Sequence, residues 1–240
     1  QPQVCSSSNR VVGLEALVRW QHPERGLLYP RDFLPLAEET KLIAKLSECV
    51  LDQACHDVGQ WIREGHSDLR LAVNLSPVQV EHPRFVETLM AQLQAHGFPP
   101  QNLEIEITEN VIMNDLEQIS QKLRELASLG VRIAIDDFGT GYSSLNYIHR
   151  LPIHTLKVDQ SFVKAIRRGE DGACIVNAIV AMAHGLKLQI VAEGVETDEQ
   201  LTYLKSLGCH QVQGFFYGPA RPADVIGKTL GHTPARAVAF

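Results

Sequence analysis

The sequence predicts an α/β protein, a modified (β/α)8 barrel of the TIM type with an antiparallel first strand. Strand-like and helix-like segments alternate along most of the chain, and only a short polar link joins the first two strands. One barrel would also use nearly all of the 240 residues. We therefore expect a single domain over residues 1–240. Because the chain opens on Gln1 without an initiator Met, we expect this domain to be cut from a longer protein.

The orientation of the first strand follows from the length of one link. Pro2–Cys5 and Val11–Trp20 are expected to be strands, and only the five residues "SSSNR" separate them. Such a link permits an antiparallel hairpin, whereas a parallel crossover needs about a dozen residues. The first strand is therefore expected to run opposite to the second.

Six further segments resemble buried strands. They are short, rich in Val, Ile and Leu, and bounded by polar residues or Gly. They are Leu69–Ser76, Leu103–Glu109, Val131–Asp137, Thr155–Asp159, Leu188–Val195 and His210–Phe215.

The intervening segments show helical periodicity. Helices are expected over Arg31–Glu39 and Leu42–Glu64, and again over 175–186 and 197–208, the last capped by Thr197. Between residues 114 and 130 the apolar positions recur at helical spacing and Gly130 marks the stop. These apolar positions, which we expect to pack in the core, are Leu116, Ile119, Leu123, Leu126 and Leu129.

Composition excludes several function classes. No apolar run approaches ~18 residues, so no membrane span is expected. The formal net charge of -6 argues against binding of DNA or RNA polymers, which needs clustered Lys and Arg. The five cysteines are scattered, odd in number and form no CxxC pair. They favour reduced thiols in a cytoplasmic domain, with a membrane anchor elsewhere in the parent protein left open.

Polar side chains end seven of the eight expected strands. In barrels of this kind the chemistry lies at the C-terminal ends of the strands, and strand alternation puts small residues such as Ala72 and Ala134 on the same face as these ends. Each polar residue alone could be an ordinary strand-end group, and Asp136-Asp137 could mark a turn capped by Ser143 or Ser144. Six residues agreeing in position favour a shared site at the barrel mouth: Glu15, Asn74, Glu106, Asp136, Lys157 and Glu193.

Several carboxylates this close together require compensation. Their pKa values would rise until some were protonated, unless cations balanced the charge. The candidate ligands are oxygens of Asp, Glu and Asn, which select Mg²⁺ or Mn²⁺ over zinc. Asp136 could bridge two ions about 4 Å apart, an arrangement suited to in-line displacement at phosphorus. Ca²⁺ is expected to inhibit. The glycine-rich loop after Asp137 is expected to be mobile.

The motifs around these residues identify the chain as a member of a known family by resemblance. "EALVRW" at Glu15 resembles the signature of the EAL-domain cyclic di-GMP phosphodiesterases. Six more motifs follow in the family's order: "NLSP" at Asn74, "EITE" at Glu106, "DDFGTGYSSL" at Asp136, "KVD" at Lys157, "EGVE" at Glu193 and "QGF" at Gln213. The resemblance implies a modified TIM barrel that hydrolyses cyclic di-GMP to linear 5'-pGpG.

The resemblance also implies roles for individual residues. Glu15, Asn74, Glu106 and Asp136 would hold one metal ion, and Asp136, Asp137 and Glu193 a second. Glu193 would also be the general base, and Lys157 would touch the attacking water or the phosphate. Substrate contacts would come from Leu17, Arg19 and Gln213. Supporting residues would be Glu109, which anchors the loop Phe138–Ser144, together with Asp159 and Glu196. One departure is Asn110, where many members have Ser after "EITE".

Two partner expectations come from the resemblance as well. The loop after Asp137 and the helix that follows it would lie near a homodimer contact. Sensor or GGDEF cyclase domains are often fused to relatives. Two other functions stay open from the sequence: a receptor that binds cyclic di-GMP without cleaving it, and a barrel that only serves as a scaffold. Binding without hydrolysis would favour the receptor, and no binding would leave the scaffold.

Overall fold

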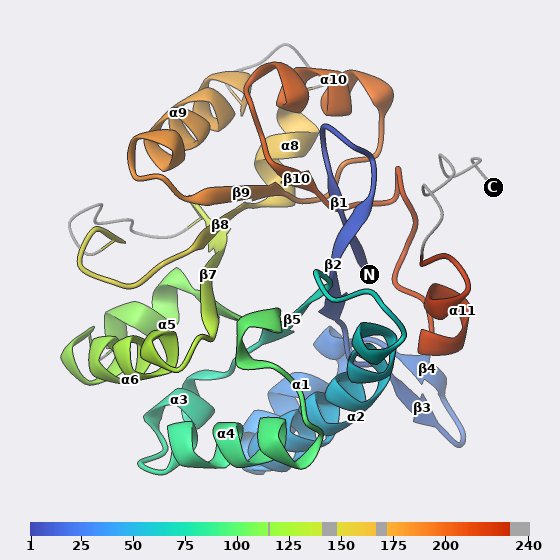
Figure 1. Ribbon diagram of the computed structural model, residues 1–240, viewed down its shortest axis with the longest axis vertical. Helices are drawn as coiled ribbons and strands as arrows, with labels where there is room; N and C mark the ends of the chain where they lie inside the picture. Colours follow the sequence, from blue (N-terminus) through green and yellow to red (C-terminus); the bar gives the residue numbers. More distant parts are fainter. Residues whose placement is uncertain (115, 141–147, 167–171, 231–240) are drawn as a thin grey trace.

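A closed barrel of eight strands organises the molecule (Figure 1). The computed structural model describes residues 1–114, 116–140, 148–166 and 172–230. The strand order is β1-β10-β9-β8-β7-β6-β5-β2. Strand β1 (Pro2–Cys5) pairs antiparallel with both β2 (Val11–Ala16) and β10 (Gln211–Val212), and the other neighbouring strands of the barrel pair in parallel. The predicted fold, including the reversed first strand, is confirmed.

The remaining barrel strands lie where the sequence places them, with shorter C-terminal ends except in β7, which extends one residue further than expected, to Phe138. Glu109 was expected to end a strand and instead begins a helix. Glu193 and Gln213 follow directly after their strands. The strands are β5 (Arg70–Asn74), β6 (Leu103–Thr108), β7 (Arg132–Phe138), β8 (Thr155–Val158) and β9 (Gln189–Ala192).

The prediction of one strand from Val11 to Trp20 is wrong. Strand β2 ends at Ala16, and Trp20–His22 forms β3, which pairs with β4 (Gly26–Leu28) in a separate two-stranded sheet. A tight turn closes this hairpin, because His22 Nδ1 accepts hydrogen bonds from the backbone N–H groups of the two residues before Gly26. Gly26 has φ +71°, a conformation that favours glycine.

Helices surround the barrel, α8 to α10 on one side and α3 to α6 on the other (Figure 1). Thr197 caps α10 as predicted, its side chain accepting from the Gln200 N–H. Gly130 and Gly208 follow the helices before them in the left-handed region. The helices are α1 (Pro30–Glu39), α2 (Ile43–Arg63), α3 (Pro77–Glu81), α4 (Phe85–Ala95), α5 (Glu109–Asn114), α6 (Leu116–Ser128), α8 (Gln160–Ile166), α9 (Gly172–Gly185), α10 (Asp198–Ser206) and α11 (Ala223–Gly227), with a short 3₁₀ turn at Pro100–Asn102.

The hydrophobic core lies between the barrel and the helices, not inside the barrel. Outward-facing strand residues such as Leu71 and Ile133 are buried there, each contributing about 1.5–3 kcal/mol. On α6, Ile119 and Leu123 join this core as expected, whereas Leu129 is 44% exposed just past the helix end, so its predicted core position is wrong. None of the described helices combines the length and apolar character that a membrane span requires.

Candidate active site

Lys157 lies at the centre of the polar group that fills the barrel mouth. Its Nζ is 2.7 Å from Glu106 Oε2, 2.7 Å from Glu193 Oε1 and 3.0 Å from Asp136 Oδ1. Glu15 Oε2 is 3.7 Å away. The lysine is fully buried. Four strands and the residue directly after a fifth therefore bring one ammonium group and four carboxylates together, as the pattern of strand ends predicts.

Strand pairing explains why these side chains meet. Because alternate residues of a strand face the interior, neighbouring parallel strands contribute side chains at similar heights. Asn74 on β5 pairs in register with Glu106 on β6. Asn74 Nδ2 donates to Glu15 Oε1 over 2.7 Å, and Gln213 Nε2 donates to Glu15 Oε2. These amides fix the Glu15 carboxylate at the rim of the group.

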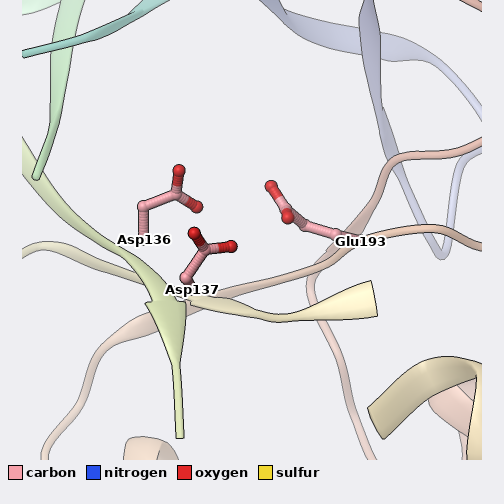
Figure 2. A group of neighbouring side chains, drawn as sticks. All are labelled: Asp136, Asp137 and Glu193. Atoms are coloured by element: carbon pink, nitrogen blue, oxygen red, sulfur yellow. The ribbon is translucent and has the colours of Figure 1, made fainter. Parts of the chain in front are cut away.

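Asp136 and Asp137 break the normal alternation of a strand. Adjacent residues should point to opposite faces. Here Asp137 has φ +51°, and the pairing of β7 with β8 shifts register between Ile135 and Phe138. Figure 2 shows that both aspartates and Glu193 consequently face one space, with one oxygen of each within 4.8 Å of the others. A left-handed aspartate costs about 1–3 kcal/mol, and such strain is concentrated at functional sites.

Crowding changes the protonation of Glu193 and Asp137, two of the acids in Figure 2. Burial, together with the charges of Asp136 and Glu15, raises the pKa of Glu193 to about 8 against the opposing effect of Lys157. Burial also raises the pKa of Asp137 to about 6, with the adjacent Asp136 adding to the effect. The two acids thus hold protons at pH values where an exposed carboxyl group is ionised.

The deeper acids respond in opposite directions. Burial and the Glu15 charge raise the pKa of Glu106 well above its ordinary value. Burial opposes ionisation of Glu15 too, yet Lys157 and the hydrogen bonds from Gln213 and Asn74 hold its pKa below the usual range. One ammonium group cannot neutralise all of these carboxylates when they are ionised, so binding of additional cations would be favourable.

The arrangement fits divalent metal ions. Glu106 Oε1 is buried and has no hydrogen-bond partner among the described residues. Asp136 Oδ1 is likewise without one, because its contact with Lys157 lacks hydrogen-bond geometry. Unpartnered buried acceptors are costly, and cations would satisfy them. The chain therefore has an acidic cluster that could hold metal, with oxygen donors only.

The supporting residues differ in how closely they join the cluster. Glu109 is buried, and its Oε1 accepts a hydrogen bond from the Gly139 N–H over 2.7 Å, at the start of the predicted loop Phe138–Ser144. Residues 141–147, which include the rest of that loop and the first part of the segment expected to form a dimer contact, lie outside the described part of the chain. Asp159 accepts from the Ser161 N–H and contributes to the raised pKa of Asp137. Glu196 is exposed before α10.

The predicted substrate contacts Leu17, Arg19 and Gln213 lie in segments that follow barrel strands and belong to no helix or strand themselves. Arg19 places its guanidinium 4.8 Å from the ring centroid of Tyr29. Leu17 is half-buried in the link between β2 and β3. Gln213 is only 4% exposed and is engaged with Glu15, while its Oε1 has no partner among the described residues. Sequence reasoning missed Tyr29, because its contact with Arg19 depends on the unpredicted β3–β4 hairpin.

Comparison with known proteins adds an independent line of evidence. Residues 1–220 match the family profile described as the EAL domain. The chain is 46% identical over 224 residues to the bifunctional diguanylate cyclase/cyclic di-GMP phosphodiesterase MucR of Pseudomonas aeruginosa, covering 93% of this chain and 33% of MucR. It is 42% identical over 230 residues to the cyclic di-GMP phosphodiesterase NbdA of the same organism, covering 96% of this chain and 29% of NbdA.

A solved structure agrees with the sequence relatives. The chain superposes on the phosphodiesterase of Pseudomonas aeruginosa MucR in its c-di-GMP complex with a TM-score of 0.91 at 46% identity, over 94% of this chain and 92% of that one. By contrast, the chain spans only about a third of the full length of the curated relatives MucR and NbdA.

Proposed function

Because this chain belongs to the EAL domain family, we propose that it hydrolyses cyclic di-GMP to linear 5'-pGpG with the help of divalent metal ions. The observation that supports this most directly is the set of carboxylates around Lys157 at the barrel mouth. A ligand with two phosphodiester groups needs cationic compensation there, and unpartnered acidic oxygens are suited to hold the cations.

The residues divide into two sets of metal ligands under this proposal. Glu15, Asn74, Glu106 and Asp136 would hold one Mg²⁺ or Mn²⁺ ion, and Asp136, Asp137 and Glu193 the other. When bound, the ions supply Lewis-acid activation of water and stabilise the negative charge that develops at phosphorus. The left-handed conformation of Asp137 makes the second set possible, because it lets two adjacent aspartates point their side chains into the same space.

Under this proposal, Glu193 is the proton acceptor and Lys157 is the hydrogen-bond donor of the reaction. In its ionised form Glu193 Oε1 accepts the proton of the attacking water, and the raised pKa favours this role because it makes the carboxylate a stronger base. Lys157 Nζ lies 2.7 Å from that oxygen and can donate a hydrogen bond to the water or to a phosphate oxygen. As the phosphodiester P–O bond breaks, the leaving oxygen takes up a proton from solvent.

The rim of the mouth would orient the ligand. Arg19, held over Tyr29, supplies a guanidinium that matches a phosphate oxygen pair or a guanine edge. Leu17 would give an apolar contact, and Gln213 Oε1 is an available acceptor. We also propose a homodimer, a cytoplasmic setting and fused sensor or GGDEF-type domains in the parent protein. Sedimentation across a range of protein concentrations tests the dimer.

One incubation tests the proposed activity. The purified chain is mixed with cyclic di-GMP and Mg²⁺, and the products are separated by chromatography, with an EDTA-treated sample as the control. Formation of 5'-pGpG that depends on metal supports the proposal. Ligand binding without product would instead assign the chain to the non-hydrolysing receptors, and absence of binding would leave only the scaffold.

A further inference from the structure

A second polar cavity lies at the opposite end of the barrel from the proposed active site. It has a volume of about 640 Å³ and is lined by Cys5, Arg70, Gln189, Lys205, His210 and Gln211, among others. Arg70, Gln189 and Gln211 are the first residues of β5, β9 and β10, so this base cavity opens at the N-terminal ends of the parallel strands.

Arg70 is a half-buried guanidinium without a counter-ion. It forms no ion pair with any described residue, and its buried Nε has no hydrogen-bond partner among them. Glu104, the acid that acts on it electrostatically, is already engaged by Arg132 Nε at 3.1 Å and Thr155 Oγ1 at 2.6 Å. A guanidinium cannot shed its proton to escape burial, so Arg70 requires an acceptor from elsewhere.

A neighbouring buried donor is also unmatched. Gln3 is 1% exposed, and its Nε2 has no partner among the described residues. Gln3 and Arg70 both border Gly13, where an added Cβ would lie 2.6 Å from Gln3 Oε1 and 3.6 Å from the Arg70 carbonyl oxygen. Both unmatched groups are N–H donors, but only Arg70 lines the base cavity, so the partner that this cavity would supply is an acceptor for Arg70.

The charges around the base cavity favour an anion. Lys205 adds a second cation that forms no ion pair within the described part of the chain, its Nζ donating only to Asn9 Oδ1 at 3.2 Å. The one carboxylate in the lining, Asp68, is exposed and is not paired with either cation. We propose that the base cavity binds an oxyanion of the phosphate class, held by the Arg70 guanidinium and the Lys205 ammonium group.

The source of the phosphate group is either inorganic phosphate or a small phosphate ester, since the volume leaves room beyond one phosphate group. Cys5 offers a local probe because its side chain lines the same cavity. Although burial opposes it, hydrogen bonds involving Ser7 and Ser8 lower the pKa of the Cys5 thiol to about 7, which favours alkylation at neutral pH. Cys49 and Cys174 are exposed on α2 and α9 and serve as internal references.

The experiment measures the rate of iodoacetamide alkylation at each cysteine by peptide mass spectrometry. Samples contain EDTA and either chloride, inorganic phosphate or ribose 5-phosphate at equal ionic strength. We expect phosphate to slow alkylation of Cys5 by at least about fivefold, through occlusion and a smaller thiolate fraction. Cys49 and Cys174 should react at unchanged rates. Stronger protection by ribose 5-phosphate than by phosphate would identify an ester as the better ligand.

Two variants assign the effect to the base cavity. Arg70→Met should abolish protection of Cys5 while Arg70→Lys keeps part of it, and in phosphate-free buffer Arg70→Met should melt no lower than the parent chain. Lys205 lies on α10, and Lys205→Met should weaken the protection of Cys5 by phosphate. If Arg70→Met does not fold, Lys205→Met alone tests the proposal. No protection in the parent chain, or equal protection in the folded variants, would overturn the proposal. The readout is independent of cyclic di-GMP hydrolysis.

Discussion

Lys157 Nζ and Glu193 Oε1 lie 2.7 Å apart across the ends of two neighbouring parallel strands, β8 and β9. Both groups are nearly buried, so each strongly affects the ionisation of the other. The proposed reaction uses Glu193 as a proton acceptor and Lys157 as a cation, and the two groups lie side by side at the barrel mouth. Replacing either partner therefore tests a different half of the mechanism.

Glu193→Gln should lower turnover of cyclic di-GMP by at least ~100-fold. The amide keeps the size of the side chain but removes the group that accepts the proton of the attacking water. Binding of cyclic di-GMP should persist, because Arg19 and the first set of metal ligands are unchanged. Product formation and ligand affinity are measured on the same preparation.

A matched control for this variant is Glu125→Gln, which makes the same chemical change on the exposed surface of α6. It should leave turnover unchanged. If Glu193→Gln also retained turnover, Glu193 would not be the general base.

Lys157→Met should destabilise the metal-free protein and make its stability depend on Mg²⁺. Methionine preserves the volume but leaves the surrounding carboxylates without their cation, and breaking a buried ion pair in this way costs about 3–5 kcal/mol. Urea unfolding in EDTA and in Mg²⁺ measures the effect. A variant as stable as the parent in EDTA would show that the acids are protonated rather than paired with Lys157.

The barrel and the residues at its mouth could be predicted because both depend on strand alternation. Ala72 and Thr155 share the interior face with the acids, and this pattern is visible in the sequence. The β3–β4 hairpin could not be predicted, because no turn residue separates Ala16 from Trp20 and the turn at His22 looks like an ordinary polar link. The left-handed Asp137 is a backbone property with no compositional signal.

Side-chain partners were the least predictable part of the site. The resemblance implies that Gln213 contacts substrate, and the structure adds a hydrogen bond from its amide nitrogen to Glu15 that the sequence does not predict. Position along a strand says which end of the barrel a residue occupies, but not which neighbour it bonds. For Glu109 the sequence misplaces the secondary structure, since this residue begins a helix, whereas its hydrogen bond from the Gly139 N–H lies in the loop that the resemblance assigns to it.

Glu109→Ala should reduce turnover and Mg²⁺ affinity, whereas Glu109→Gln should retain most of both. Glu109 Oε1 accepts from the Gly139 N–H, two residues after the strained Asp137. Alanine leaves that N–H without this acceptor, a loss of about 1–3 kcal/mol, and releases the backbone that holds Asp137. Glutamine has a side chain of the same length, and its carbonyl oxygen can still accept the hydrogen bond from the Gly139 N–H. Equal activity of both variants would show that this hydrogen bond does not position Asp137.

Mg²⁺ and Mn²⁺ should support product formation, and Ca²⁺ should inhibit it. The donors are all oxygens, so Ca²⁺ can enter, but it prefers about 2.3–2.6 Å bonds against about 2.0–2.1 Å for Mg²⁺, and more ligands. The longer bonds would loosen the in-line geometry. Turnover is measured with each ion after EDTA treatment, and with Ca²⁺ added to the Mg²⁺ enzyme. Full activity in Ca²⁺ alone would contradict the proposed metal geometry.

The stability of the metal-free parent chain, measured relative to the Glu193→Gln variant, should fall as the pH rises from 7 to about 8.5. The pKa of Glu193 is raised to about 8 in the folded state, so that state binds more protons than the unfolded chain across this window. The stabilising contribution is complete at low pH and is lost as the pH passes the folded value, by up to about 1 kcal/mol per pH unit. Asp137, with a pKa of about 6, has already lost its proton here.

Histidines do not obscure this window. Burial lowers the pKa values of His154 and His210, so both are neutral above pH 7 in the folded and unfolded states. Urea unfolding of both proteins at several pH values in EDTA should give a difference in the free energy of unfolding that falls across this window. Other titrating groups, such as Cys5 with its lowered pKa, are common to both proteins and cancel in this difference. Mg²⁺ should stabilise the parent chain increasingly as the pH rises, because its binding competes with the proton on Glu193. A difference in EDTA that is flat or rising between pH 7 and 8.5 would mean that Glu193 is already ionised beside Lys157.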